Sequence, residues 1–395
     1  MKSLDYARQA YKLSLESKYL PGKALAKKNE GVIWFFIGKN DSAALCYKQA
    51  LGIFTSIGDE KGESACYNNL GLIAQETGKY DEALTYYQSS IDIDHKSGDE
   101  IGVATTKGNI ADIFMYQGKT KKALVITGEC IEIFKRHENK IGLMSSYSTR
   151  ASEYDYLVMY DKAILDYIEA LKIAIDLNDT YQEIVTNSNI GVVYWHYGKP
   201  KIAMKYLNKA LEMSDEVDDA YNIDNTLKTI AQIYTSQKEY IKANEILIKV
   251  LKRVEGIDNK RQVADIMTSM GRNLIELNEI DKALGYLNES LRITKKLDTP
   301  YELLENYRNL AYAYAILHEF KTADSIQDCF AQTYSVILSS DSASEIVGQS
   351  IVNQDDNLSD KSSIGKINNW IIAFLLFTII SIASVYAYLD KKKGE

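Results

Sequence analysis

Cysteine and histidine are the side chains that most often supply a nucleophile, a metal ligand or a proton relay, and this chain has four of each. They are Cys46, Cys66, Cys130 and Cys329, and His95, His137, His196 and His318. They show no CxxC or HExxH spacing, so no metal centre and no nucleophile–base pair is recognisable. We expect the cysteines to be small core residues. The sequence predicts no catalytic residue and no metal site.

Cofactor loops and basic surfaces are also missing from the pattern. Neither GxxxxGK[ST] nor a GxGxxG that opens a helix after a strand occurs, so we expect no cofactor. The chain has 46 basic and 54 acidic residues and a net charge of −8. Because no basic excess is present to neutralise phosphates, we expect no nucleic-acid partner. Carboxylates are plentiful, but on an acidic helical surface they are usually solvated. We therefore predict that the chain is not an enzyme.

The elements that would position any site recur with a fixed period of forty positions. Alanine occupies one position in eight successive units: Ala43, Ala83, Ala123, Ala163, Ala203, Ala243, Ala283 and Ala323. Twelve residues earlier each unit has glycine or alanine, from Gly31 and Gly71 to Ala311. Three residues after that small residue stands a mostly large, aromatic one, such as Trp34 or Tyr194. A period of this length indicates a stacked repeat architecture.

Each unit has the pattern of two helices joined by a turn. Gly38, Gly78, Gly118 and Gly198 lie between the two small positions, where a left-handed residue ends the first helix. Only three prolines occur in 395 residues, and we expect all of them, Pro21, Pro200 and Pro300, at helix ends. An amphipathic hairpin cannot bury its apolar face alone, so neighbouring units must stack. The sequence predicts an all-α solenoid.

This pattern resembles the tetratricopeptide repeat family. Asn-Leu-Gly at 69–71 and Gly-Lys-Tyr-Asp-Glu-Ala-Leu at 78–84 are close to the consensus of that family. The unit of forty positions resembles a variant with longer helices, and the usual proline at the end of the second helix is absent. The resemblance implies a right-handed superhelical solenoid of eight helical hairpins over residues 23–338. Residues 1–22 form a leading helix, or half repeat.

The resemblance also implies a peptide-binding groove lined by the first helix of each hairpin. The position two residues before the small residue reads Asn29, Asn69, Asn109, Thr149, Asn189, Thr229, Ser269 and Asn309. Asparagine donates and accepts hydrogen bonds, so this asparagine column can bind the backbone of an extended peptide, or else bond neighbouring helices. Neighbouring cations that could hold acidic groups are Lys28, Lys228, Arg272 and Arg308. Trp195 is either an exposed anchor or ordinary packing.

The repeat pattern stops after Leu338, and the sequence changes character twice. Residues 339–369 are rich in Ser, Asp and Asn and indicate a polar linker. Residues 370–389 carry no charge and have the length of a bilayer crossing, with Trp370, Tyr386 and Tyr388 near the ends. Residues 390–395 form a basic tail. We therefore predict a single-pass membrane protein.

The two ends of the chain also bear on its function. Because residues 1–22 match the second helix of a ninth unit, we expect a truncated chain, or else a single capping helix. Lysines after the span favour repeats on the extracytoplasmic side. The arrangement resembles the sensory half of bacterial membrane signalling proteins of the histidine kinase or cyclase type. The predicted function is a membrane-anchored sensor or scaffold that binds a peptide or protein; the alternative is a tail-anchored cytoplasmic adaptor. The sequence does not fix the oligomeric state.

Overall fold

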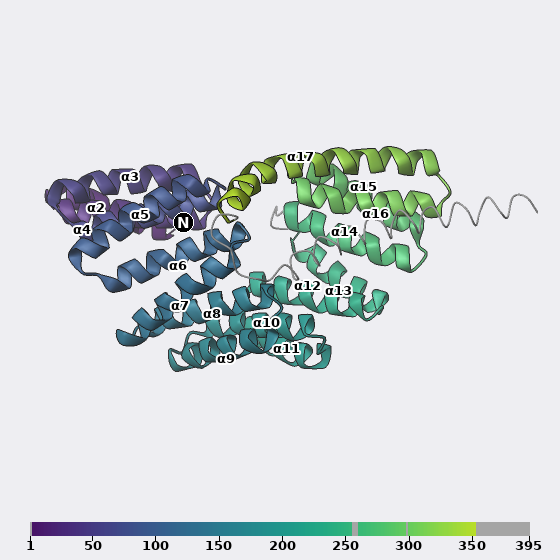
Figure 1. The fold of residues 1–395 in the computed structure, drawn as a ribbon, viewed down its shortest axis with the longest axis horizontal. Helices are drawn as coiled ribbons and strands as arrows, with labels where there is room; N and C mark the ends of the chain where they lie inside the picture. Colours follow the sequence, from purple (N-terminus) through teal and green to yellow (C-terminus); the bar gives the residue numbers. More distant parts are fainter. Residues whose placement is uncertain (1, 255–259, 298, 353–395) are drawn as a thin grey trace, which may run out of the picture. The chain divides into compact units, whose positions relative to one another are not determined.

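The computed structural model describes residues 2–254, 260–297 and 299–352, and every element in them is an α-helix (Figure 1). The described helices are α1 (Lys2–Glu16), α2 (Leu20–Phe36), α3 (Asn40–Ile57), α4 (Glu60–Glu76), α5 (Tyr80–Ser97), α6 (Glu100–Tyr116), α7 (Thr120–Arg136), α8 (Lys140–Tyr156), α9 (Tyr160–Asp176), α10 (Thr180–His196), α11 (Pro200–Glu216), α12 (Ala220–Ser236), α13 (Tyr240–Val254), α14 (Lys260–Glu276), α15 (Ile280–Leu297), α16 (Pro300–Ile316) and α17 (Phe320–Val352). This order confirms the predicted all-α class, a leading helix followed by eight pairs.

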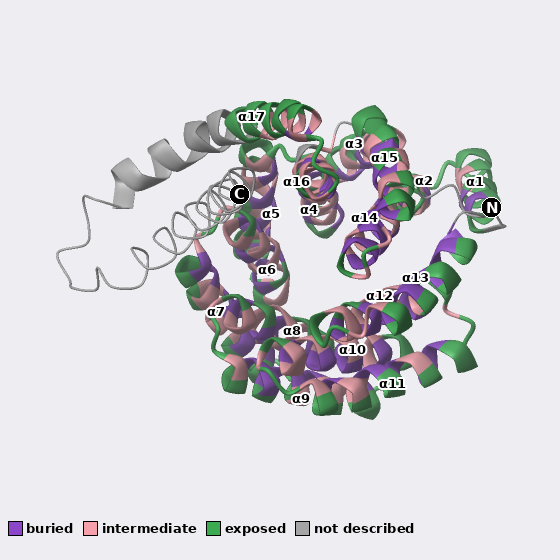
Figure 2. Cartoon of the chain, turned by 90° about the vertical axis from the view of Figure 1, so that its right-hand side faces the viewer, coloured by how far each residue is buried: buried purple, intermediate pink, exposed green. Residues whose placement is uncertain are grey.

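The chain divides into two compact units, residues 1–279 and residues 280–395. In the first unit each helix packs on the next one along the chain. In addition, α2 contacts α4, α4 contacts α6, α6 contacts α8, and α10 contacts α12. The even-numbered helices therefore share one layer, and α7, α9 and α11 lie outside it (Figure 2). In the second unit α15 packs on α16 and α16 on α17.

The described turns between helices each place one left-handed residue, and these residues lie at positions twenty apart or a multiple of twenty apart. The predicted turn glycines have positive φ, for example 76° at Gly38 and 73° at Gly78. At Gly38 the backbone N–H bonds the Phe35 carbonyl, and the next N–H bonds the Trp34 carbonyl, which closes the preceding helix. Other turns place a residue with a side chain in the same conformation: Lys18, Glu138, Val158, Asn178, Asp218, Lys238, Asn278 and His318. The turn geometry therefore does not depend on glycine.

Five even-numbered helices, α4, α6, α8, α10 and α12, begin with a side-chain cap, whereas α2 does not. The side chain of Asp59 accepts a hydrogen bond from the Gly62 N–H at 2.9 Å, which caps α4. Equivalent caps come from the same position of the following repeats: Asp99, Asn139, Asp179 and Asp219. The odd-numbered helices α3, α5, α7 and α11 follow a lysine that makes no such bond. Pro21, Pro200 and Pro300 lie in the first turn of their helices, as predicted.

The core lies between the two layers and contains the predicted small residues. The first seven residues of the alanine series, from Ala43 to Ala283, are fully buried, and Ala323 is 7% exposed. A Cβ on Gly71 would come within 2.4 Å of the Tyr87 ring, and one on Gly191 within 2.6 Å of Leu207. The small residues therefore let a large side chain of the following helix close the hairpin.

The C-terminal part differs from the sequence expectation in one place. Helix α17 continues to Val352, so residues 339–352 of the predicted polar linker are helical. This stretch contains no proline, and short polar residues alone do not end a helix. No helix of residues 2–254, 260–297 and 299–352 is long and apolar enough to cross a membrane. The predicted span 370–389 and the tail 390–395 lie outside the described residues.

Candidate functional site

The asparagine column lies on the even-numbered helices, as the repeat register requires. In the first unit Asn29 is exposed on α2, and Asn69, Asn109 and Asn189 are half-buried on α4, α6 and α10. The Nδ2 of Asn109 donates a hydrogen bond of 2.8 Å to the Oδ1 of Asn68 on α4. One member of the column therefore joins neighbouring helices of the layer, which is the structural role that sequence reasoning left open.

The last member of the column belongs to the second unit. Asn309 on α16 is only 6% exposed, and its Nδ2 has no hydrogen-bond partner in the described part of the chain. Beside it, Arg308 pairs with Glu305 one turn earlier at 3.5 Å. Because the two residues lie in a separate unit, they are not placed against the rest of the column.

The predicted cations and Trp195 have different surroundings in the first unit. Lys28 on α2 and Arg272 on α14 are half-buried. Lys228 on α12 forms an ion pair with Asp265 on α14, so its charge joins two even-numbered helices. Trp195 on α10 is partly buried and packs on a core cluster that includes Leu207. This contact favours packing over an exposed anchor.

A recess opens between α6 and α8 and includes part of the column. Its volume is about 350 Å³, and α7 forms its floor through the buried side chains of Thr127 and Phe134. Both even-numbered helices contribute hydrogen-bonding side chains to its lining, in addition to Thr127 of α7 and Asn139 of the turn before α8: Thr105, Asn109, Asp112, Ser145, Ser146 and Thr149. We call this cavity the α6–α8 recess. It offers amide, hydroxyl and carboxylate groups to a ligand from the side of the even-numbered helices.

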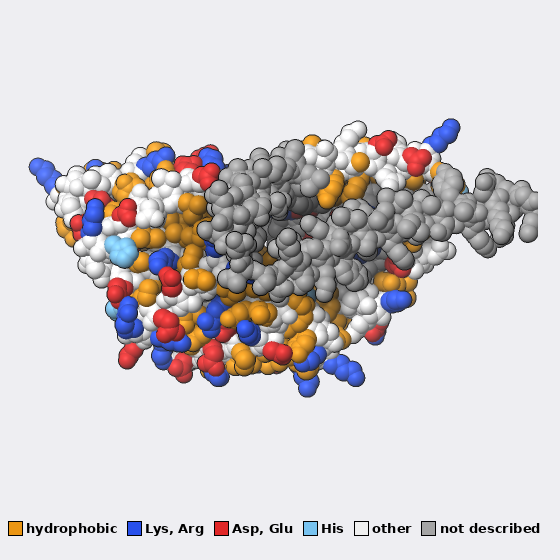
Figure 3. Space-filling model, in the orientation of Figure 1, with side chains coloured by type: hydrophobic (Ala, Val, Ile, Leu, Met, Phe, Trp, Pro, Cys, Tyr) orange, Lys and Arg blue, Asp and Glu red, His pale blue; other side chains and the backbone are white. Residues whose placement is uncertain are grey.

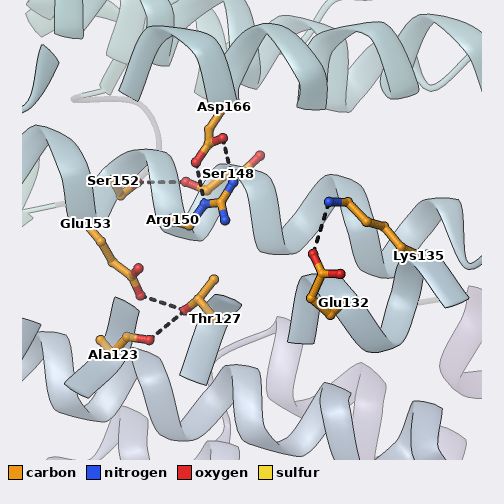
Figure 4. Close-up of polar contacts among 9 residues, drawn as sticks. All are labelled: Ala123, Thr127, Glu132, Lys135, Ser148, Arg150, Ser152, Glu153 and Asp166. Carbon is orange, nitrogen blue, oxygen red and sulfur yellow. Dashed lines mark hydrogen bonds and ion pairs between the residues drawn. The ribbon is translucent and has the colours of Figure 1, made fainter. Parts of the chain in front are cut away.

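A buried acid lies behind the floor of the α6–α8 recess. Glu153 on α8 is fully buried, and its Oε1 lies 2.7 Å from the Oγ1 of Thr127 (Figure 4). The Thr127 hydroxyl also donates to the Ala123 carbonyl at 3.0 Å. Because a hydroxyl has one proton, Thr127 donates at one time to either the Glu153 carboxyl or the Ala123 carbonyl. Burial raises the pKa of Glu153 to about 7, although the hydrogen bond from Thr127 lowers it.

Asp112 is a second perturbed acid in the same place. It lies on α6 in the lining of the recess, and burial raises the pKa of its carboxyl to about 6. The charge of Asp112 also raises the pKa of Glu153. Sequence reasoning singled out neither residue. A signal for Glu153 was present, because the equivalent positions of neighbouring repeats read Ile73, Ile113 and Val193.

The cysteines and histidines are dispersed in the fold. Cys46, Cys66 and Cys130 are buried, and burial raises the pKa of the Cys66 and Cys130 thiols to about 12. Such thiols stay protonated, which disfavours nucleophilic chemistry. His196 lies 3.0 Å from an Asp155 oxygen on α8, which raises the pKa of the imidazole. Among the described residues, no three His, Cys, Asp or Glu side chains are grouped to hold a metal ion.

Basic and acidic side chains are interspersed on the visible face of the molecule. Where undescribed residues do not cover this face, lysines and arginines alternate with acids and leave apolar side chains between them (Figure 3). Elsewhere in the described chain, several charges pair between consecutive odd- and even-numbered helices or within one helix. Lys140, for example, bonds Asp176 at 2.7 Å, and Lys107 bonds Glu129 at 2.7 Å.

Comparison with known proteins identifies the repeats. Two family models, both described as tetratricopeptide repeat, match the sequence. The first matches residues 63–136 and 222–296, and the second matches residues 186–216. No curated protein matches the chain.

Three solved structures have a similar fold at low sequence identity. A signal transduction ATPase with numerous domains and a tetratricopeptide repeat sensor, from Pyrococcus horikoshii, superimposes with a TM-score of 0.63 at 18% identity, over 86% of this chain and 54% of that one. The apo quorum sensor NprR from B. thuringiensis superimposes with a TM-score of 0.62 at 16% identity, over 84% of this chain and 98% of that one. A Rap protein complexed with competence and sporulation factor superimposes with a TM-score of 0.60 at 16% identity, over 86% of this chain and 95% of that one.

At these identities the likeness concerns the fold alone. The family models, the regular spacing of the turns and the paired helices all agree on the same architecture. Residues 63–136, 186–216 and 222–296 of this chain therefore contain tetratricopeptide repeats.

Proposed function

We propose that the layer of even-numbered helices in residues 1–279 binds an extended peptide or a protein segment, and that the α6–α8 recess is the centre of that site. The observation that carries this proposal is the recess itself. Amide and hydroxyl groups of Asn109, Thr105 and Thr149 converge on it from two helices. Such groups can bond both the N–H and the C=O of a peptide backbone. Two proteins of similar fold, described as a quorum sensor and as a complex with a named factor, agree with a binding role.

The site is tested by selection of a random peptide library against the full chain. Replacement of Asn69, Asn109 and Asn189 by alanine removes three members of the column, and we expect selected peptides to bind this variant at least tenfold more weakly. The matched control is Asn208→Ala, because Asn208 is an exposed asparagine on α11 in the other layer. Circular dichroism checks that the helices persist in both variants. Unchanged affinity in a folded triple variant would reject the site.

We further propose that residues 370–389 anchor the protein in a membrane and that the repeats act as the sensory or scaffold part of a signalling system. The long uncharged stretch and the basic tail after it support the anchor. The fold shared with a protein that has a tetratricopeptide repeat sensor supports the sensory role. The basic tail favours repeats on the extracytoplasmic side; the tail-anchored adaptor is the alternative.

Two measurements separate these arrangements. Deletion of residues 368–395 should release the protein from the membrane fraction, whereas continued sedimentation with membranes would reject the single anchor. Protease added outside intact cells should digest the repeats if they are extracytoplasmic. Protection in intact cells together with digestion after lysis would instead favour the cytoplasmic adaptor.

A further inference from the structure

The charge of the α6–α8 recess narrows the class of ligand that the proposed site accepts. Among the residues that line it, Asp112 is the only one with a charged side chain. Burial is the sole cause of its raised pKa, so no hydrogen bond or ion pair from the described residues compensates its carboxylate. A carboxylate that is partly removed from water without a partner is costly, and a bound cation would offset that cost.

The cations of the two helices that form the recess are all engaged elsewhere. On α8, Arg150 makes two hydrogen bonds of 2.6 and 2.9 Å to Asp166 on α9 (Figure 4). The other two, Lys107 on α6 and Lys140 on α8, are paired with acids of α7 and α9. The basic side chains of α6 and α8 therefore pair with acids of the odd-numbered helices, and none of them pairs with Asp112.

A second observation points the same way. Glu153 is fully buried behind Thr127, its side chain is directed toward the recess floor, and its Oε2 has no hydrogen-bond partner within the described chain (Figure 4). An anionic ligand group in the recess would be repelled by the carboxylate of Asp112, whereas a cationic group would be attracted to it. The residue behind the floor is an acid, so it brings no positive charge to this side of the recess.

The size and lining of the recess suit one long side chain. Its volume of about 350 Å³ lies at the lower end of the range of ligand pockets, so the recess has room for one long side chain. Apolar walls at Ala104, Phe134 and Ile141 match the methylene stem of lysine or arginine, whose polar end needs acceptors. The Asn109 side chain supplies such an acceptor beside Asp112.

We propose that the α6–α8 recess binds a lysine or arginine side chain of the peptide ligand, with Asp112 as its counter-ion. This inference rests on the proposed peptide-binding function and adds to it the charge of the ligand. It assigns specificity to one carboxylate of α6, while the amide and hydroxyl groups around it bind the backbone.

The test compares peptides selected from a random seven-residue library by the full chain and by its Asp112→Asn variant. Peptides selected by the unsubstituted protein should be enriched in lysine or arginine at one position. A synthetic selected peptide should lose at least tenfold in affinity when that residue becomes glutamine. Asp112→Asn should reduce this loss to about twofold or less, whereas Asp112→Glu should retain most of it. The matched control is Asp92→Asn, an exposed aspartate on α5, and it should behave as the unsubstituted protein.

The outcomes distinguish this inference from the function on which it rests. Selected peptides without a basic position, or with a basic preference that persists in a folded Asp112→Asn variant, would overturn the inference and leave peptide binding intact. If no peptide is selected by the unsubstituted chain, both the peptide-binding function and the inference fail. Circular dichroism of each variant confirms that it is folded.

Discussion

Two neighbouring regions of the same unit fill the same structural position with opposite chemistry. Where α5 meets α6, Tyr87 and Ile113 are both fully buried and belong to one apolar cluster. One repeat later, where α7 meets α8, the equivalent residues are Thr127 and Glu153, exposed by only 1% and 0%. The position in the repeat therefore determines how deeply a residue is buried. A polar side chain can replace an apolar one at that position if its polar groups form hydrogen bonds with each other. The smaller Thr127 also forms part of the floor of the α6–α8 recess.

The turns of the two regions differ as well. The turn between α4 and α5 has Gly78 at its left-handed position, with φ of 73°. The turn between α8 and α9 has Val158 there, with φ of 61°. A β-branched residue in this conformation is strained, because its Cβ substituents crowd the backbone. The region with the polar pair thus also contains a strained joint.

The largest expected effect comes from removal of the buried acid. Glu153→Gln keeps the shape and the bond to Thr127 but cannot ionise. In the unsubstituted protein the pKa of Glu153 is about 7 when folded, against 4.5 without the protein environment. The unfolded chain thus loses this proton first, and the free energy of unfolding falls as pH rises from about 4.5 to about 7. We expect the variant to be more stable by about 3 kcal/mol at pH 8 and nearly unchanged at pH 4.

Urea denaturation of both proteins at a series of pH values measures this difference. Asp112 also has a raised pKa, but it is present in both proteins, so the difference between them reports Glu153 together with its electrostatic coupling to Asp112. A variant that is destabilised equally at pH 4 and pH 8 would show that Glu153 acts as a packed or hydrogen-bonded residue, without a cost of ionisation.

The next largest effect concerns the apolar region. Gly71→Ala places a methyl group 2.4 Å from the Tyr87 ring, which is fully buried and has no room to move. Overpacking should exceed the gain in helix propensity, so we expect a loss of about 2 kcal/mol. Gly108→Ala is the matched control, because no atom lies within 4 Å of its added Cβ. The control should gain about 0.5–1 kcal/mol. Equal melting temperatures for the two variants would contradict the close contact.

The smallest effect concerns the turns. Val158→Gly should relieve the strained joint and stabilise the protein by about 0.5–1 kcal/mol, after the entropy of glycine in the unfolded chain is counted. The reciprocal change, Gly78→Val, should destabilise the protein by a similar or larger amount. Thermal unfolding followed by circular dichroism measures both. If Val158→Gly lowers the melting temperature, the turn after α8 tolerates valine without strain.

Most of the fold follows from residues that have one physical role in every repeat. The alanine series marks the buried side of the odd-numbered helices, and glycines such as Gly38 mark the left-handed turns. These positions are set by backbone approach and backbone dihedral angles, which depend on sequence locally. The left-handed turns at Glu138 and Val158 were harder to predict from the sequence. There the neighbouring helices impose a left-handed conformation that glutamate and valine disfavour.

The candidate site was harder to predict, because its properties arise from pairs of residues far apart in sequence. The asparagine column was placed on the correct helices, yet the bond from Asn109 to Asn68 joins residues of two different repeats. The importance of Asp112 depends on the partners that Arg150 and Lys107 find on other helices. A repeat register indicates which face a residue occupies. It does not indicate which charge is left without a partner.

The regular spacing of the described left-handed residues has a consequence for how such a chain can change in length. From α2 to α16 the helices begin twenty residues apart, which is half of the period visible in the sequence. Duplication or loss of two consecutive segments in this range restores the alternation of odd- and even-numbered helices, whichever joint is used. The architecture thus has twice as many positions at which a duplication or deletion can begin as its sequence period suggests. A fixed spacing of the joints is therefore compatible with a variable number of repeats.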